Sequence, residues 1–354
     1  MTSAPGTRPL FSVVCPTFER SAAIIDTLDS VSAQTESNFE MIVVADGCTD
    51  DTVDWVRSAA ARDDRITLIR TERHGHPSTP RNIGCSAAVG EFVAYIDHDD
   101  QWTPDHLEAL RALFDAGADV AATGSTSYDP AGAVVSRSTP LDMCWHPDIA
   151  TLGAQFEPSR VAHRAGIAGA VGGWRTGSGL EDWDLWIRIA DAGFDFWTTV
   201  ATTARISLDP RTRRHRIPPR RFLPIVEFDS ARDARATVDA VRDPAVLDRF
   251  RDAYVQDATA RYARLQRSPR FRRPSGWTGS IENEIRRSAA QSTSAWASLM
   301  VVRSGTKFAV AEPVWCTDDS HHERIAELSP EVNRTQFAVV AKIGRATAGL
   351  QMSG

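Results

Sequence analysis

The stretch Glu91-Phe92-Val93-Ala94-Tyr95-Ile96-Asp97-His98-Asp99-Asp100 decides the fold, because an apolar run leads directly into three carboxylates within four residues. An apolar run of this length between polar residues predicts a strand that is buried on both faces. Carboxylates at its carboxyl end would project from the edge at which open α/β sheets bind ligands. The stretch therefore predicts a parallel sheet with a polar ligand site at its edge.

The acidic pattern that follows this strand has two interpretations. If the chain stays extended, Asp97 and Asp99 lie on one face and can reach one ion. Oxygen ligands of this kind suit Mg²⁺ or Mn²⁺, whose coordination is usually completed by substrate phosphates. In the other interpretation the segment is an acidic turn, and Asp100 caps the next helix. The D-x-D pattern alone is too short to decide between them.

The composition is that of a globular protein, with 354 residues of which 42% are apolar and 24% charged. The net charge of −6 argues against a general nucleic-acid binder. The first residues lack the apolar core of a signal peptide, and no apolar run approaches the roughly 18 residues that span a membrane. Five widely spaced cysteines without a C-x-x-C pair predict buried, reduced thiols. We therefore expect a cytoplasmic protein without a nucleic-acid partner, a membrane span or structural zinc. Its oligomeric state does not follow from the sequence.

Upstream of the opening strand, β-branched apolar runs alternate with amphipathic segments. This alternation of strand and helix predicts a doubly wound α/β fold with right-handed crossovers. The expected strands are 10–15, 40–45, 65–70 and 91–96, and the expected helices are 21–33, a segment after residue 51, and 81–89. Ser21 is the expected N-cap of the first helix.

The rest of the chain divides into three expected parts. Residues 1–216 would form one α/β domain, with two halves at about 10–100 and about 101–216. Residues 217–275 would be a helical segment and linker. Residues 276–354 would form a small module of unknown role, rich in β-strands at the apolar runs 299–302, 308–311 and 337–340. Within it, Asp318–His322 is expected to be an exposed loop.

Four motifs occur in order along the first hundred residues, and three of them follow predicted strands. They are Ser12-Val-Val-Cys-Pro-Thr-Phe-Glu-Arg20, Val44-Ala-Asp-Gly-Cys-Thr-Asp-Asp-Thr52, Arg81-Asn-Ile-Gly84 and Ile96-Asp-His-Asp-Asp100. In these motifs and their spacing the chain resembles the inverting family 2 nucleotide-sugar glycosyltransferases, which have the GT-A fold. A further resemblance lies downstream, where Val171-Gly-Gly-Trp174 and Glu181-Asp-Trp-Asp-Leu-Trp-Ile-Arg188 are similar to that family's V-G-G-F and E-D-W-D-L-W-x-R.

The resemblance implies a role for each matching residue. Asp182 would be the catalytic base that removes a proton from the acceptor hydroxyl. A divalent Mn²⁺ or Mg²⁺ would be held by Asp99, with Asp97 and His215 as further ligands. The implied donor-binding residues are Pro16, Phe18, Glu19, Asp46, Arg81, Asp97 and His98. The implied acceptor-binding residues are Trp174, Glu181 and Trp183.

Several of these residues also have a structural interpretation. Glu19 replaces the family's usual Asn, and its role could be limited to shaping a turn. His98 could be only a spacer between Asp97 and Asp99. Arg81 could be a surface residue rather than a phosphate ligand, and His215 could belong to a basic solvated loop. Asp46 follows alanine where the family has a second acid, and this leaves the donor base open among UDP-, dTDP- and GDP-linked sugars.

The resemblance implies sugar transfer from a nucleotide-sugar donor to a hydroxyl of a small molecule, peptide or glycan, with inversion. One alternative is a nucleotidyltransferase, although the glycine-rich phosphate loop typical of that class is missing from Pro16–Arg20. A second alternative is a non-catalytic sugar-binding protein on the same fold. The joint presence of Asp97, Asp99 and Asp182 disfavours it.

Overall fold

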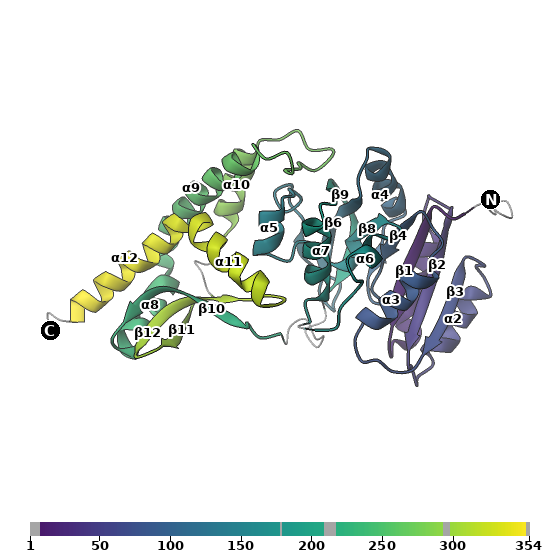
Figure 1. The fold of residues 1–354 in the computed structure, drawn as a ribbon, viewed down its shortest axis with the longest axis horizontal. Helices are drawn as coiled ribbons and strands as arrows, with labels where there is room; N and C mark the ends of the chain where they lie inside the picture. Colours follow the sequence, from purple (N-terminus) through teal and green to yellow (C-terminus); the bar gives the residue numbers. More distant parts are fainter. Residues whose placement is uncertain (1–7, 178, 209–216, 293–297, 352–354) are drawn as a thin grey trace. The chain divides into compact units, whose positions relative to one another are not determined.

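The computed structural model describes residues 8–177, 179–208, 217–292 and 298–351. The chain forms two compact units (Figure 1). The N-terminal unit comprises Met1–His215 and Arg272–Trp277, and the C-terminal unit comprises Arg216–Phe271 and Thr278–Gly354. Among the described residues no helix is both long and apolar enough to cross a membrane.

The N-terminal unit is built on one sheet whose strands run in the order β3-β2-β1-β4-β8-β6-β9-β5, with β7 paired to β6. Its strands are β1 (Phe11–Thr17), β2 (Phe39–Asp46), β3 (Ile66–Thr71), β4 (Phe92–Tyr95), β5 (Gln101–Trp102), β6 (Val120–Tyr128), β7 (Val134–Arg137), β8 (Val161–Arg164) and β9 (Phe196–Ser207). The four strands expected upstream are all present and pair in parallel, which confirms the α/β fold.

The second half of the sheet is mixed rather than mostly parallel. Strand β8 runs antiparallel to both β4 and β6, whereas β6 and β9 are parallel to each other. Short strand β5 pairs antiparallel with β9 at the edge. The sequence predicted a strand near 160–164 but not this reversal, because the direction in which β8 pairs depends on its distant neighbours β4 and β6.

Helices cover both faces of this sheet. They are α1 (Ile24–Ser32), α2 (Thr52–Ala60), α3 (Ser78–Ala87), α4 (His106–Asp115), α5 (Pro147–Leu152), α6 (Ile167–Ala170) and α7 (Glu181–Asp191). Helices α1, α2 and α4 contribute to one apolar core, and α5, α6 and α7 contribute to the other. Successive residues of a strand point to opposite faces, and in β1 Val13 and Cys15 join the first core while Val14 joins the second.

The start of α1 differs from expectation. Ser21 is not the N-cap of that helix, because it lies in a preceding 3₁₀ turn with a positive φ of 44°. Its backbone N–H instead donates to the side chains of Asp50 and Thr52, at 3.1 and 2.7 Å. These contacts tie the loop after β1 to the start of α2.

The C-terminal unit combines a small antiparallel sheet, β10-β12-β11, with helices. Its elements are β10 (Arg221–Phe228), α8 (Ala231–Arg242), α9 (Leu247–Leu265), α10 (Ile281–Gln291), β11 (Met300–Ser304), β12 (Lys307–Val314), α11 (Asp319–Val332) and α12 (Arg334–Gln351). Phe228, Val238 and Phe250 share one buried core with Leu299, Val310 and Val340. Two of the predicted strands are therefore present, at β11 and β12.

Two local predictions for the C-terminal unit are wrong. The apolar run 337–340 lies inside α12 rather than in a strand, because so short a run has no periodicity that separates the two. The segment Asp318–His322 is not a loop but the beginning of α11. The side chain of Asp318 accepts a hydrogen bond from the backbone N–H of His321 at 2.8 Å, which is a typical N-cap contact.

Candidate active site

The polar strand ends of the N-terminal unit meet at one edge of the sheet. Strands β1, β2 and β4 are parallel neighbours, so Thr17, Asp46 and the Asp97–Asp100 segment all lie at their carboxyl ends. The Asp97–Asp100 segment does not continue the extended strand. It forms a tight turn in which the N–H of Asp100 donates to the carbonyl of Asp97 at 3.0 Å. The expectation that Asp97 and Asp99 share one strand face is therefore wrong.

Asp97 contacts a buried arginine that also reaches the downstream motif. The Nη2 of Arg81 lies 2.6 Å from Asp97 Oδ1, and its Nη1 lies 3.4 Å from Glu181 Oε1. The guanidinium also lies 4.5 Å from the ring centre of Trp174. Burial alone would lower the pKa of Arg81, but the charges of Asp97 and Glu181 outweigh it and raise that pKa. Arg81 is therefore a buried cation between two motifs that are 84 residues apart (181 − 97).

Asp99 contacts a different arginine. Arg20 Nη2 donates to Asp99 Oδ2 at 2.8 Å, and Arg20 Nε donates to His98 Nε2 at 2.7 Å. Burial, with the charge of Arg20 as a second cause, lowers the pKa of His98 to about 3. His98 is therefore neutral near pH 7. The sequence indicated no role for Arg20, although Arg20 is the last residue of the first motif.

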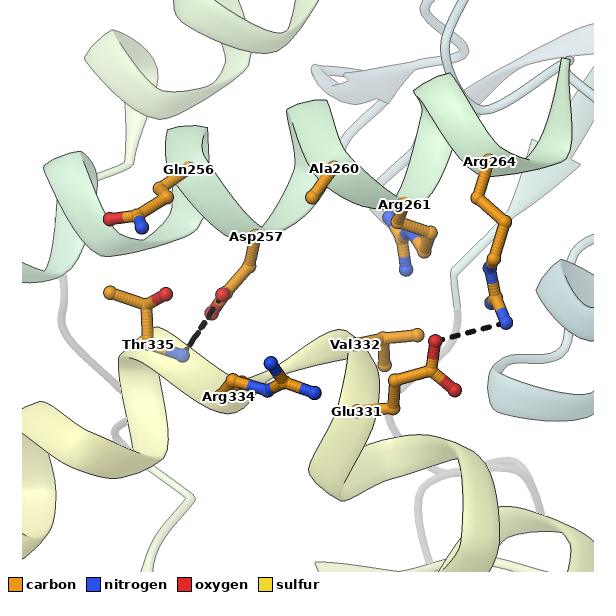
Figure 2. Close-up of a pocket in the computed structure, with 9 residues that line it drawn as sticks. All are labelled: Gln256, Asp257, Ala260, Arg261, Arg264, Glu331, Val332, Arg334 and Thr335. Carbon is orange, nitrogen blue, oxygen red and sulfur yellow. Dashed lines mark hydrogen bonds and ion pairs between the residues drawn. The ribbon is translucent and has the colours of Figure 1, made fainter.

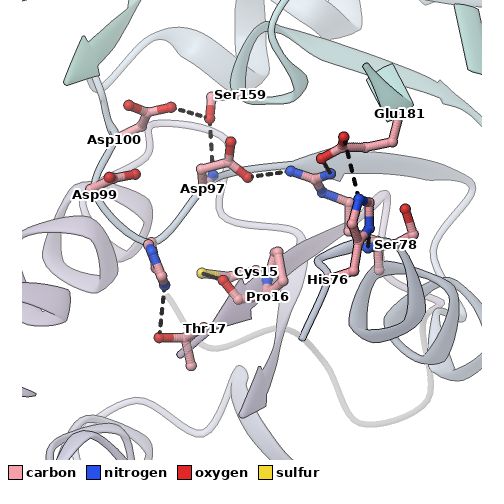
Figure 3. A network of polar contacts seen from close by, with 12 residues as sticks. Cys15, Pro16, Thr17, His76, Ser78, Asp97, Asp99, Asp100, Ser159 and Glu181 are labelled. Carbon is pink, nitrogen blue, oxygen red and sulfur yellow. Dashed lines mark hydrogen bonds and ion pairs between the residues drawn. The ribbon is translucent and has the colours of Figure 1, made fainter. Parts of the chain in front are cut away.

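Asp100 is buried and forms hydrogen bonds to two other segments of the domain, so it is not a helix cap. Its side chain accepts hydrogen bonds from Ser159 Oγ at 2.5 Å and from the N–H of Ser207 at 2.8 Å. Ser159 in turn accepts from the N–H of Asp97 at 2.9 Å (Figure 3). Burial, helped by the charges of Asp99 and Asp97, raises the pKa of Asp100 well above its usual range. Asp100 thus joins the turn to the end of β9.

Asp46 organises the loop that follows β3. Its buried carboxylate accepts from the backbone N–H groups of His74 and Gly75 at 2.8 and 3.1 Å, and it pairs with the guanidinium of Arg73. Burial acts to raise the pKa of Asp46, but these hydrogen bonds outweigh it and lower that pKa. Sequence reasoning treated His74 as an ordinary loop residue, and no local signal pointed to this contact.

The other expected donor residues of the first motif lie beside this loop. Pro16 is buried in β1, and the Arg73 guanidinium lies 3.5 Å from the centre of the Phe18 ring. Glu19 has a positive φ of 47°, and its carboxylate accepts from the N–H of Thr49 at 2.7 Å. These contacts give Phe18 and Glu19 structural partners on the loops that follow β3 and β2.

The asparagine of the third motif connects the two halves of the domain, and the glycine of that motif lets α3 pack on β1. Asn82 donates to the carbonyl of Trp174 and accepts from its N–H, both at 2.8 Å. A Cβ at Gly84 would lie 2.4 Å from a methyl carbon of Val14, so only glycine lets α3 pack this closely on β1. A Cβ at Gly173, where φ is 69°, would lie 2.8 Å from Asn82 Oδ1.

The acidic motif forms the first turn of α7, where carboxylates are stabilised by the helix dipole. Asp182 is partly exposed, and its Oδ1 accepts from the N–H of Trp183 at 2.8 Å. Glu181 is buried, and its Oε2 lies 3.7 Å from His76 Nε2 (Figure 3). The indole of Trp183 is also buried and donates to the carbonyl of Ala150. The structure thus places Asp182 at the end of α7 that Arg81 connects to Asp97.

Residues 12–170 match the family described as "Glycosyl transferase family 2". Within the N-terminal unit, these residues form a family 2 glycosyltransferase domain. Two curated relatives that match this chain come from Bacillus subtilis (strain 168). The putative teichuronic acid biosynthesis glycosyltransferase TuaG is 37% identical over 101 residues, or 28% of this chain and 40% of that protein. The putative glycosyltransferase EpsE is 28% identical over 192 residues, or 52% of this chain and 68% of that protein.

A solved structure is also similar to the glycosyltransferase domain. The crystal structure of S. aureus TarS 1-349 in complex with UDP-GlcNAc is 20% identical, with a TM-score of 0.49 over 61% of this chain and 62% of that one. The chain spans between 16% and 40% of the length of four of the curated relatives that it matches.

The glycosyltransferase domain offers few side chains to a divalent cation. Among the described residues no group of three or more His, Cys, Asp or Glu side chains could hold a metal ion. Mg²⁺ and Mn²⁺ need no such group when one or two carboxylates act together with substrate phosphates. Asp97 and Asp99 fit this pattern, with side chains that are 31% and 26% exposed. The third expected ligand, His215, lies outside the described residues.

Proposed function

We propose that this protein transfers a sugar, with inversion, from a nucleotide-sugar donor to a hydroxyl group of its acceptor. The observation that carries the proposal is the contact of one buried guanidinium, that of Arg81, with both Asp97 and Glu181. Asp97 ends the strand expected to bind the donor, and Glu181 directly precedes the expected base, Asp182. The contact therefore brings the donor motif and the acceptor motif to one place.

In the proposed reaction Asp182 takes the proton of the acceptor hydroxyl while that oxygen attacks the anomeric carbon. The new C–O bond forms on the face opposite to the leaving group, and the bond between the sugar and the nucleoside diphosphate breaks. Asp182 lies in the first turn of α7, where the helix dipole stabilises the ionised carboxylate that would accept this proton. General-base catalysis of this kind contributes roughly 10²–10⁴ in rate.

The leaving diphosphate carries negative charge that the site must stabilise. Asp99 would hold a divalent cation together with the diphosphate, and when bound that cation supplies charge neutralisation and electrophilic assistance. Asp97 would lie nearer the ribose while keeping its ion pair with Arg81. A soluble acceptor such as a natural product, peptide or glycan is part of the proposal, as is Mn²⁺ or Mg²⁺ as the cation.

The test compares donor binding and turnover in three variants of the full chain. We expect Asp99→Ala to abolish metal-dependent hydrolysis of the nucleotide sugar and the thermal stabilisation by nucleoside diphosphate with Mn²⁺. Asp182→Asn should keep that stabilisation and lose turnover by about 10²-fold or more. Asp191→Asn, at the exposed far end of the same helix, is the matched control and should behave as the parent protein.

Three outcomes would contradict the proposal. Full turnover in Asp182→Asn would exclude that residue as the base. Release of inorganic diphosphate, rather than a nucleoside diphosphate, would identify a nucleotidyltransferase. Tight donor binding with no turnover under any metal would identify a sugar-binding protein.

A further inference from the structure

The C-terminal unit contains a pocket that the proposed sugar transfer does not use. It has a volume of about 260 Å³ and lies between α9 and the junction of α11 with α12 (Figure 2). Its lining residues are Gln256, Asp257, Ala260, Arg261, Arg264, Glu331, Val332, Arg334 and Thr335. Three of these residues are arginines, whose positive charges require acceptor groups nearby.

Both acidic residues of the pocket already interact with other groups. Asp257 accepts hydrogen bonds from the N–H groups of Thr335 and Gln336, at distances of 2.9 to 3.1 Å. These are N–H groups of the first turn of α12, so Asp257 neutralises the positive end of that helix. Glu331 pairs with Arg264 at 3.1 Å. Among the described residues, neither carboxylate forms an ion pair with the two remaining arginines.

Those two arginines, Arg261 and Arg334, form no ion pair with any residue in the described part of the chain. Arg261 lies on the wall formed by α9, and Arg334 lies on the facing wall (Figure 2). The Nε of Arg261 is buried and has no hydrogen-bond partner among the described residues. A buried N–H of a charged group that lacks an acceptor costs free energy, which an incoming acceptor would recover.

We propose that this pocket binds an oxyanion, held between the guanidinium groups of Arg261 and Arg334. The planar fork of an arginine matches the oxygens of phosphate and carboxylate groups, so both chemistries fit this site. The side chains of Gln256 and Thr335 add neutral hydrogen-bonding groups at the rim. The N-terminus of α12 is not the binding element, because Asp257 already occupies it.

The ligand would be a phosphoryl or carboxylate group of a small molecule or of a charged sugar. The C-terminal unit would then recognise an anionic ligand independently of the donor site in the glycosyltransferase domain. Because no residue of the pocket belongs to the proposed catalytic site, this inference does not depend on the proposed function.

The experiment measures binding of inorganic phosphate and of glucuronate to the full chain by calorimetry, with sodium chloride at matched ionic strength as the reference. We expect saturable binding of at least one probe. Arg261→Gln and Arg334→Gln should each weaken it about tenfold, the loss typical of one charge-assisted hydrogen bond. Arg249→Gln removes an exposed arginine from the same helix α9 and should leave binding unchanged.

The two probes separate the two ligand sources. Binding of phosphate alone identifies a phosphoryl ligand, and binding of glucuronate alone identifies a carboxylate sugar. Absence of saturable binding of both probes would overturn the inference. Equal binding by the parent protein and the two pocket variants would also overturn it, because the anion would then be held elsewhere, for example at the donor site. Circular dichroism and nucleotide-sugar hydrolysis, both expected to be unchanged in Arg261→Gln and Arg334→Gln, show that the variants are folded.

Discussion

Replacement of Asn82 by alanine tests how the glycosyltransferase domain holds its two halves together. The Asn82 amide makes two hydrogen bonds with the backbone of Trp174, both of 2.8 Å. Alanine would remove both and leave the N–H and carbonyl of a buried residue without that partner. Each net hydrogen bond is worth about 1 kcal/mol, and each unpaired buried group costs about 1–3 kcal/mol. With two such groups left unpaired, we expect Asn82→Ala to destabilise the domain by about 2–6 kcal/mol.

The assay needs a local readout, because a chain of two units need not unfold in one step. Hydrogen exchange of the segment around Trp174 supplies it, since the Trp174 N–H donates directly to Asn82 Oδ1. Exchange of this segment should accelerate in Asn82→Ala, and urea unfolding should report the loss of stability. Ser86→Ala, one turn further along α3, removes only an exposed hydroxyl that donates to the Asn82 carbonyl. It should cost no more than about 0.5 kcal/mol.

A double-mutant cycle with Gly173 sharpens the test. Gly173→Ala should cost about 1–3 kcal/mol, because φ is 69° and the new Cβ would lie 2.8 Å from Asn82 Oδ1. Removing the Asn82 side chain relieves that contact, so the two losses should sum to more than the loss of the double variant. Strict additivity, or exchange at Trp174 that is unchanged in Asn82→Ala, would refute the reasoning.

Two further predictions concern packing and pH. Gly84→Ala should destabilise the domain by about 1–3 kcal/mol in urea unfolding, because its Cβ would lie 2.4 Å from a valine methyl of β1. Gly169→Ala, whose Cβ would have no neighbour within 4 Å, should have no such cost. Hydrogen bonds from Arg65 lower the pKa of Asp63 from 3.8 to about 2, so the ionised form stabilises the fold by about 2 kcal/mol at pH 7. That contribution is lost as the pH falls from 3.8 through about 2, so Asp63→Asn should lower the free energy of unfolding at pH 7 and leave it unchanged below pH 2. Asp64→Asn, at an exposed neighbouring residue, is the control. A loss of stability that does not depend on pH would contradict the assignment.

The sequence predicted those features that depend on local pattern. The strands β1 to β4 appear where β-branched runs predicted them, and their carboxyl ends meet at the predicted edge. Features that depend on distant partners could not be predicted. Asp100 was expected to cap a helix, but its partners Ser159 and Ser207 lie 59 and 107 residues further along the chain. Nothing in the sequence around Asp100 signals these contacts.

The motif residues themselves combine two kinds of requirement. Asn82 and Gly84 were recognised only as part of a pattern, yet their contacts are structural: one pairs with Trp174 and the other permits a close approach to Val14. A motif of this kind therefore contains residues that hold the fold as well as residues that could react. The sequence alone cannot tell the structural residues of a motif from the reacting ones, because both stand in the same short pattern.

In the proposed reaction, the ion pairs at the sheet edge favour one of the two carboxylates, Asp99, as the cation ligand. Asp99 pairs with Arg20, and both side chains are more than a quarter exposed, at 26% and 28%. Replacing such a pair costs at most about 1 kcal/mol. Asp97 pairs with Arg81, whose side chain is 3% exposed and also contacts buried Glu181. If Asp97 turned from this pair to a cation, the buried Arg81 guanidinium would keep only Glu181 as a counter-charge. In the proposed reaction, binding of the cation through Asp99 would therefore cost less, and Asp97 would keep its ion pair with Arg81 and with it the connection to α7.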